Sequence, residues 1–360
     1  MPYLRCLHLV QFKNYSDRRF RFDSPITGIC GPNGTGKTNL LDAIHYLCFT
    51  RSHFNRTDAA HVQQGRSGFR IEGTWERDGE TESSTCILRE NGRKEITLNG
   101  TAYARFSQHI GRYPCVIVAP DDSELLTGGG SDRRNFLDTL LSQVDSEYLR
   151  HLIQYTRILD QRQSHLRALA ERRGAPDELL DVLDEQLLEP GTVLYQKRHR
   201  FLETFVPVVL KRYADIASSA EPITIRYRSD LQEHPLDVLL REGRSRDLAA
   251  VRTCSGVHRD DLVIELFGQP FRSCASQGQR KSLLFALKLA EMDTLQQVKG
   301  SPPLLLLDDV FEKLDESRIR NLLRSVCIEH QGQVLITDTH PERLEGYLQS
   351  LKRPFGLIVL

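Results

Sequence analysis

The chain has 360 residues and a mass of 41.2 kDa, enough for two ordinary domains or one large bilobed domain. Hydrophobic residues make up 39% and charged residues 27%, a balance that excludes a wholly disordered chain. Lys plus Arg and Asp plus Glu both number 48, so nucleic-acid binding would require a local basic patch rather than a net charge. The eight cysteines form no C-x-x-C pair, and the N-terminal residues 1–5 do not lead into the apolar core of a signal peptide. We therefore expect reduced thiols in a cytoplasmic protein that makes no membrane contact.

Residues 1–119 have the pattern of short strands around one helix. Apolar or alternating runs predict strands at 4–10, 20–22, 26–30, 86–88, 95–98 and 115–119. Phe69, Ile71 and Trp75 lie on one face of a further alternating run. Asp-Gly at 78–79 and Asn-Gly at 91–92 and 99–100 separate the later runs, which predicts hairpins and an antiparallel meander.

From Ser131 the apolar spacing becomes helical. It predicts one helix over 148–169, a second over 179–187 after the Gly-Ala-Pro break at 174–176, and a third over 195–216. We expect these helices to pack a core of their own, and a helix that binds a partner or DNA is the alternative. The apolar stripe spans too few heptads for a long coiled coil. Strands at 304–307 and 334–336 return the chain to α/β character.

The segment 31–38 reads G-P-N-G-T-G-K-T and fits G-x-x-x-x-G-K-[ST] in full, between an apolar strand and a helical run. The ATP-binding residues predicted from it are Gly31, Pro32, Asn33, Gly34, Thr35, Gly36, Lys37, Thr38 and Asn39. Glycines let the backbone N–H groups turn toward the phosphates, and the start of the helix adds a favourable dipole. We expect the Lys37 ammonium to reach the β- and γ-phosphates and the Thr38 hydroxyl to bind Mg²⁺.

Four leucines followed by Asp308 and Asp309 are typical of a buried central strand that ends at a ligand site. Asp308 is predicted to act on Mg²⁺, and Asp309 to orient or deprotonate the attacking water. The alternative is a buried strand that ends in a helix cap.

A small polar tetrapeptide, Ser276, Gln277, Gly278 and Gln279, precedes a strongly apolar helical run. Ser276 is a good helix N-cap, and this by itself explains the pattern. A capped helix N-terminus is also an anion site, so a phosphate-binding role is the second interpretation.

The order of these motifs resembles the ABC-type ATPase heads of the SMC and RecF group, and within it the RecF family, across nearly the whole chain. The resemblance also includes Leu314-Asp315 and Thr339-His340 after the four leucines. Four further segments carry it, namely Asn14-Tyr15, 120–138 with its Pro-Asp-Asp and Arg-Arg-x-Phe-Leu-Asp, S-G-V-H-R-D-D-L at 255–262, and A-S-Q-G-Q at 275–279. Val257 stands where the family has Pro, and Gly128-Gly129-Gly130 stands where it has Gly-x-Pro.

The resemblance implies an α/β fold, an ABC-type ATPase head with a mixed sheet and an antiparallel β subdomain, plus a mainly helical lobe II without a long coiled coil. Lobe I would comprise 1–119 and 293–360, and lobe II 120–292. Two subunits would enclose two ATP molecules, each between one P-loop and the opposing Ser276 signature. Leu314 and Asp315 would form the D-loop, and His340 the switch histidine that senses the γ-phosphate. A cap or surface histidine is the alternative for His340.

The resemblance further implies an ATP-dependent DNA-binding protein of recombinational repair with ATP and Mg²⁺ as cofactors. The ATP-bound homodimer would bind double-stranded DNA and single-strand/double-strand junctions, and would help RecO and RecR load RecA. Asp309 stands where transport ABC proteins carry Glu and is one methylene shorter, which predicts slow hydrolysis. The resemblance implies that DNA stimulates this hydrolysis. Backbone-directed Arg51, Arg56, Arg66 and Arg70 are candidates for DNA contacts.

Three alternatives remain at this stage. The head of a long SMC clamp would need hundreds of residues of heptads that this chain lacks. The ATP-binding subunit of a transporter would be stimulated by membranes rather than by DNA. A clamp that binds ATP without hydrolysing it would keep the same motifs.

Overall fold

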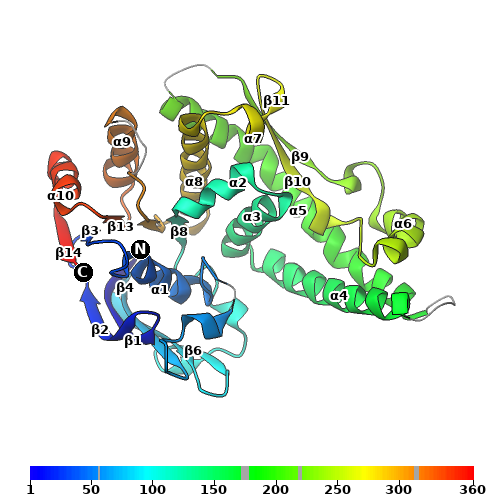
Figure 1. Ribbon diagram of the computed structural model, residues 1–360, viewed down its shortest axis with the longest axis horizontal. Coiled ribbons are helices and arrows are strands. Elements are labelled where there is room, and N and C mark those ends of the chain that lie inside the picture. The colour runs from blue at the N-terminus through cyan, green and yellow to red at the C-terminus, as the bar shows by residue number, and fades with distance from the viewer. Residues whose placement is uncertain (56, 172–177, 218–220, 312–315) are drawn as a thin grey trace. The chain divides into compact units, whose positions relative to one another are not determined.

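The computed structural model describes residues 1–55, 57–171, 178–217, 221–311 and 316–360. The chain divides into two compact units (Figure 1). Unit 1 comprises Met1–Asp122 and Leu287–Leu360, and unit 2 comprises Ser123–Ala286. The boundaries expected from the sequence were 119/120 and 292/293.

Unit 1 contains two sheets. Its strands are β1 (Pro2–Phe12), β2 (Tyr15–Arg21), β3 (Ile26–Cys30), β4 (Phe69–Arg77), β5 (Glu80–Leu88), β6 (Lys94–Leu98), β7 (Thr101–Ala102), β8 (Cys115–Val118), β12 (Leu304–Leu307), β13 (Val334–Asp338) and β14 (Phe355–Val359). Its helices are α1 (Lys37–Phe49), the end of α8 (Gln277–Lys299), α9 (Glu316–Leu323) with a following π-helical turn (Arg324–Glu329), and α10 (Pro341–Ser350).

The five-stranded sheet of unit 1 is parallel and has the order β14-β3-β13-β12-β8. Strands β3, β8, β12 and β13 are buried along their whole length, as the uninterrupted apolar runs predicted. The carboxyl ends of β3, β12 and β13 therefore lie at one edge, and the loops after them carry the predicted nucleotide motifs.

The six-stranded sheet is antiparallel, in the order β2-β1-β4-β5-β6-β7. The predicted meander is confirmed, and Asp78-Gly79 and Asn99-Gly100 have positive φ at both positions, as a type I′ hairpin turn requires. Phe69, Ile71 and Trp75 are all buried on one face of β4.

Helix α1 lies between the two sheets and contacts strands of both. Almost every side chain from Leu40 to Phe49 is buried, so the helix that follows the P-loop is held on all sides. Apolar side chains of both sheets and of α1 form one continuous core. In it the indole of Trp75 stacks on Tyr113 with ring centroids 4.0 Å apart.

Unit 2 is mainly helical. It contains α2 (Glu124–Thr127), α3 (Gly130–Val144), α4 (Ser146–Glu171), α5 (Glu178–Ala217), β9 (Ile223–Arg228), α6 (Leu236–Ala250), β10 (Asp261–Leu266), β11 (Gln269–Pro270), α7 (Phe271–Cys274) and the start of α8. Helices α4 and α5 pack along each other (Figure 1). No helix of the described residues is long enough for an extended coiled coil of the SMC kind.

The prediction of separate helices over 179–187 and 195–216 is wrong, because α5 runs continuously through Pro190 and Gly191. Proline removes one backbone donor, and glycine is a weak helix former, so the local pattern favoured a break. Packing overrides it, since a Cβ at Gly191 would lie 2.5 Å from Leu236 Cδ2 and 3.1 Å from the Tyr155 ring. The glycine lets α4 and α6 approach α5 closely.

Unit 2 also contains a three-stranded sheet in the order β11-β10-β9, which was not predicted from the sequence. Its strands are short and lie between helices, so their alternation was not evident. The break predicted at 174–176 lies outside the described residues.

A buried arginine holds the centre of unit 2. Arg198 is 2% exposed and donates to the Tyr148 hydroxyl (2.8 Å) and the Val257 carbonyl (2.7 Å). It also pairs with Asp138 (2.7 Å) and Asp260 (3.0 Å). Because these partners come from α3, α4 and the 255–262 segment, one guanidinium joins segments far apart in the chain.

A buried cluster of charges in unit 1 contains one more acid than its lysine can neutralise. Lys288 Nζ lies 3.5 Å from Asp122 and 3.7 Å from Glu291, and His53 Nε2 lies 3.0 Å from Asp122. Burial opposes ionisation of Asp122, but Lys288 and His53 hold its pKa below the usual range. Burial raises the pKa of Glu291 to about 7, because Lys288 offsets only part of the desolvation.

We expect Glu291→Gln to be more stable than the wild type at pH 8 and to lose this advantage toward pH 5. The pKa of Glu291 is higher in the folded state than in the unfolded chain, so the folded state binds the proton more tightly. This contributes stability to the wild type at a pH below the pKa of the unfolded chain, and the contribution is lost as the pH rises through about 7. The difference should be roughly 2–3 kcal/mol between these pH values. Urea unfolding at both pH values measures it. The exposed Glu80→Gln serves as control, and parallel pH profiles for all three proteins would refute the assignment.

All eight cysteines are free thiols. Among the described helices, none combines the length and apolar character needed to cross a membrane.

Candidate nucleotide-binding site

The P-loop connects β3 to α1, which begins at Lys37. Gly34 and Gly36 have φ of 84° and 105°, in the left-handed region that a Cβ disfavours. The Lys37 ammonium is buried and donates to the carbonyl oxygens of Gly31 (2.8 Å) and Pro32 (3.1 Å). An ammonium has three donors, so Lys37 is held inside the loop with capacity left for a phosphate oxygen.

The turn between β1 and β2 supports the P-loop. Asn14 Nδ2 donates to the Thr35 carbonyl (3.0 Å), and the Tyr15 hydroxyl donates to the Gly36 carbonyl (3.0 Å). Asn39, predicted to bind ATP, donates through its side-chain amide to Asn14 Oδ1 (2.8 Å). The family resemblance assigned no role to Asn14-Tyr15, and the structure shows that the pair contacts the loop between β3 and α1.

Gly36→Ala should lower nucleotide affinity at least tenfold. A Cβ at Gly36 would lie 2.4 Å from Asn14 Nδ2, and the positive φ alone costs about 1–2 kcal/mol for alanine. Titration with a fluorescent ATP analogue measures the change. Gly346→Ala in α10 is the matched control, because its Cβ would meet no atom within 4 Å. Equal affinities for the two variants would contradict the close-packed loop.

Asp308 joins the P-loop to β12. Its backbone N–H donates to the Val118 carbonyl (2.8 Å), which continues the parallel pairing of β12 with β8. The Thr38 hydroxyl donates to Asp308 Oδ2 (2.8 Å), and the Thr337 hydroxyl donates to Oδ1 (2.7 Å). Burial raises the pKa of Asp308, although these hydrogen bonds and the charge of Lys37 favour the carboxylate. The fold thus joins two predicted motifs that lie 270 positions apart in the sequence.

Asp309 follows at the same edge of the sheet. Its φ is 45°, an uncommon value for a non-glycine residue, and its backbone N–H donates to Thr337 Oγ1 (2.9 Å). Thr337 therefore contacts both aspartates and fixes their positions. Thr337 was not predicted as a site residue, and its only signal in the sequence was its place directly after the strand predicted at 334–336.

His340 lies at the carboxyl end of the neighbouring strand β13. Asp338 is buried there, and its carboxylate accepts two hydrogen bonds from the Arg343 guanidinium (2.7 and 3.0 Å). The same carboxylate also accepts from the His340 backbone N–H (2.8 Å). The His340 side chain is 69% exposed, and its Nδ1 lies 2.8 Å from Thr339 Oγ1. His340 is the N-cap residue of α10, so its imidazole is accessible to a ligand at this edge.

The signature segment starts helix α8 in unit 2. The Ser276 backbone N–H donates to Gln279 Oε1 (2.8 Å), and the Gln279 backbone N–H donates to Ser276 Oγ (3.2 Å). This is a capping box, so the N-cap interpretation of Ser276 is confirmed. The Ser276 hydroxyl proton is left to donate to an anion, and Ser276 and Gln277 are exposed. Gln279 Nε2 also donates to Glu221 (3.1 Å).

The predicted D-loop residues, Leu314 and Asp315, lie outside the described residues.

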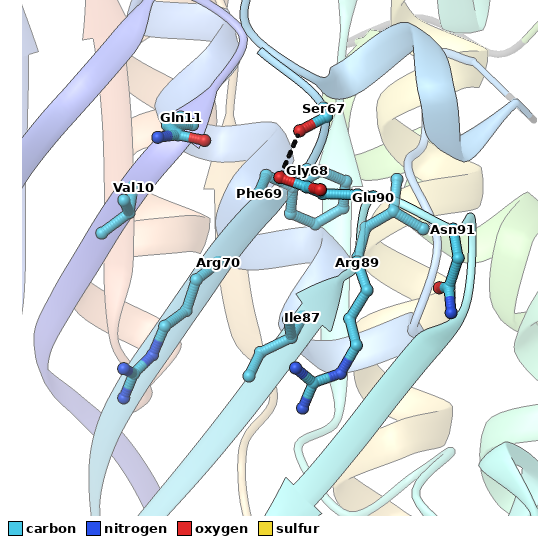
Figure 2. Close-up of a pocket in the computed structure, with 11 residues that line it drawn as sticks. Val10, Gln11, Ser67, Gly68, Phe69, Arg70, Ile87, Arg89, Glu90 and Asn91 are labelled. Atoms are coloured by element: carbon cyan, nitrogen blue, oxygen red, sulfur yellow. Dashed lines mark hydrogen bonds between the residues drawn. The ribbon is translucent and has the colours of Figure 1, made fainter.

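The four arginines proposed for DNA contacts differ in their surroundings. Arg56 lies outside the described residues, and Arg70 donates to Glu72. Arg70 lines a hollow of about 610 Å³ on the antiparallel sheet, together with Arg89 (Figure 2). Arg89 is paired with Glu95, so both guanidinium groups there are already neutralised by carboxylates.

The Thr38 hydroxyl and the Asp308 carboxylate fit a magnesium ion. Both are hard oxygen donors, and their 2.8 Å separation places them together at the end of the P-loop. Mg²⁺ commonly takes one or two protein ligands and completes its shell with water and substrate phosphates. Among the described residues, no three His, Cys, Asp or Glu side chains gather in a way that could hold a metal.

Comparison with known proteins places this fold in a class. The chain matches the family described as RecF/RecN/SMC N terminal domain over residues 3–353. It has the fold of the Smc head domain from Pyrococcus furiosus, with a TM-score of 0.54 at 16% identity, covering 96% of this chain and 92% of that one. The protein is therefore an ABC-type ATPase head of the SMC-like class, as the sequence predicted.

Within this class, the chain is similar in sequence and structure to proteins named RecF. The chain is 40% identical to the DNA replication and repair protein RecF of Flavobacterium johnsoniae, covering 99% of this chain and 100% of the relative. It is 39% identical to RecF of Porphyromonas gingivalis, covering 98% and 96%. A solved structure of the recombination mediator protein RecF with ATP has a TM-score of 0.86 at 30% identity, covering 94% of this chain and 92% of that one. The chain belongs to the RecF family.

Proposed function

We propose that this protein acts as an ATP-dependent DNA-binding protein in recombinational repair, in the cytoplasm. One observation carries the proposal: the Thr38–Asp308 hydrogen bond joins the two predicted nucleotide motifs in a chain that is similar over its whole length to RecF proteins. In this proposal the ATP-bound homodimer binds double-stranded DNA beside single-strand gaps. There it helps RecO and RecR load RecA, and slow hydrolysis of ATP releases it.

The site residues support ATP binding with Mg²⁺. The positive φ of Gly34 and Gly36 would let the backbone N–H groups of the loop face the phosphates, and Lys37 would add a charged donor. Thr38 and Asp308 would hold Mg²⁺, which supplies charge neutralisation between the phosphates. Nucleotide binding would separate Lys37 from its backbone carbonyls only in part, because the ammonium can keep one of them.

The capped start of α8 supports a second, intermolecular phosphate contact. Helix N-termini attract anions, and the Ser276 hydroxyl proton is available to donate. We propose that this end of unit 2 binds the γ-phosphate of ATP held by the second subunit. Unit 1 would then act as lobe I and unit 2 as lobe II of an ABC-type head.

Hydrolysis would depend on Asp309, with His340 as the γ-phosphate sensor. Thr337 and the positive φ of Asp309 hold its backbone at the end of β12, next to Asp308. The shorter aspartate side chain favours a slow rate. Stimulation of this rate by DNA rather than by membranes is the expected behaviour.

Sedimentation with and without ATP-Mg²⁺ tests this function. The wild type should form dimers only with ATP. Lys37→Ala should lose nucleotide binding, by about 100-fold, and with it the dimer. Ser276→Arg should bind ATP normally but stay monomeric, because a cation and a bulky side chain replace the small donor. A Ser276→Arg protein that dimerises with ATP would show that Ser276 is only a helix cap.

A further inference from the structure

The segment 255–262 is held mainly by contacts inside unit 2. Ser255 Oγ accepts from Arg246 Nη2 (2.6 Å), and His258 is bound on both sides of its ring, by the Tyr155 hydroxyl (2.8 Å) and the Thr253 carbonyl (3.0 Å). Burial, and then the charges of nearby arginines, lower the pKa of His258 to about 4. It is therefore a neutral structural residue at physiological pH.

The two aspartates of the segment are also engaged. Asp260 is buried and pairs with Arg198 (3.0 Å). Asp261 accepts two hydrogen bonds from Arg133 (2.6 and 3.1 Å). These contacts fix the backbone of the segment on both sides of Arg259.

Arg259 is different from its neighbours. It ends the one-turn helix Val257–Arg259, and its backbone N–H donates to the Gly256 carbonyl (2.8 Å). Its side chain is exposed, and none of the residues that the structure describes forms a hydrogen bond or ion pair with it. A rigid backbone thus presents a guanidinium group whose five donors face solvent.

Two further guanidinium groups belong to the same network as Arg259. Arg134 donates to the Asp260 carbonyl (2.6 Å) and has no ion pair among the described residues, and its charge acts on His258 together with that of Arg259. Arg228 is 69% exposed and lies 3.5 Å from Asp261, whose oxygens Arg133 already occupies. We call Arg134, Arg228 and Arg259 the arginine cluster.

The surrounding network carries an excess of positive charge. Six arginines face four carboxylates in it, namely Arg133, Arg134, Arg198, Arg226, Arg228 and Arg259 against Asp138, Asp260, Asp261 and Glu265. Arg198 uses two of the carboxylates in the interior. Within the arginine cluster, Arg228 and Arg259 carry this uncompensated charge at the surface, and Arg134 is half-buried beside them.

We propose that the arginine cluster binds the phosphodiester backbone of double-stranded DNA, with Arg259 as its main contact. Planar guanidinium groups bind phosphates bidentately, and contacts of this kind position a duplex without reading its bases. The inference rests on the proposed function, since it assigns part of the DNA-binding surface.

The test is the salt dependence of DNA binding with ATP-Mg²⁺, followed by fluorescence anisotropy of a labelled duplex. Arg259→Gln should weaken binding about tenfold at low salt and reduce the slope of log K against log salt by about one. Arg259→Lys should keep most of the slope, because it keeps the charge. Arg167→Gln is the matched control, an exposed arginine of α4 without an ion pair among the described residues.

Several outcomes would overturn the assignment. An Arg259→Gln protein with the slope and affinity of Arg167→Gln would remove Arg259 from the DNA surface. Loss of ATP-dependent dimers in Arg259→Gln, with DNA binding per dimer unchanged, would assign the arginine to nucleotide instead. If the wild type itself binds no duplex, the proposed function fails, which is distinguishable from failure of this inference.

Discussion

Replacement of Arg198 by methionine will destabilise the protein by about 3–5 kcal/mol. The substitution leaves the buried Asp260 and the partly buried Asp138 without their cation. It also removes the donors to the Tyr148 hydroxyl and the Val257 carbonyl. A loss of this size is a large part of the 5–15 kcal/mol typical of a folded domain, so we expect unit 2 to unfold at low urea concentration.

Urea unfolding followed by circular dichroism measures this loss. Arg167→Met on α4 removes a similar side chain from an exposed position and should change stability by less than about 0.5 kcal/mol. If Arg198→Met is as stable as Arg167→Met, the network does not hold unit 2 together. The DNA surface proposed for Arg259 would then also lose its rigid support.

Asp309→Asn will lower the rate of single-turnover ATP hydrolysis by about 100-fold or more, with nucleotide affinity nearly unchanged. Asparagine keeps the size of the side chain but cannot accept the proton of the attacking water, and general-base catalysis contributes about 10²–10⁴-fold. The Thr337 contact to the backbone of Asp309 is kept, so the geometry of the loop should survive.

Conversion of labelled ATP to ADP under enzyme excess measures this rate. Asp23→Asn, an exposed position of unit 1, should hydrolyse ATP like the wild type. Equal rates for Asp309→Asn and the wild type would remove Asp309 as the base. A wild type that binds ATP and hydrolyses none would instead favour the alternative of a clamp that works by binding alone.

Arg198→Met tests the structural role of the 255–262 segment, whose Asp260 pairs with Arg198, and Asp309→Asn tests the catalytic role of the acid after β12. The P-loop and the aspartates after β12 meet at the carboxyl edge of a parallel sheet, where a ligand is expected. The 255–262 segment, by contrast, is mostly a structural core element. Its histidine and aspartates resemble catalytic residues in sequence, yet each is engaged by a neighbour within unit 2.

The sequence alone determined the elements whose signals are local. The glycine-rich loop, the four-leucine strand and the Asp-Gly and Asn-Gly turns were predictable, because backbone conformation and burial at these places depend on few neighbouring residues. The helix N-cap at Ser276 is also a local feature, since its partner Gln279 is only three positions away.

Only the tertiary structure decided the features that depend on distant neighbours. Pro190 and Gly191 continue a helix because α4 and α6 pack against it, and Thr337 fixes the acidic pair only through the pairing of β12 with β13. Arg198 is a buried ion-pair partner, whereas Arg259 is exposed and has no ion pair among the described residues. Which of these an arginine becomes depends on the carboxylates that the fold brings within reach. Electrostatic contacts join residues far apart in the chain, so no local pattern could have distinguished the two.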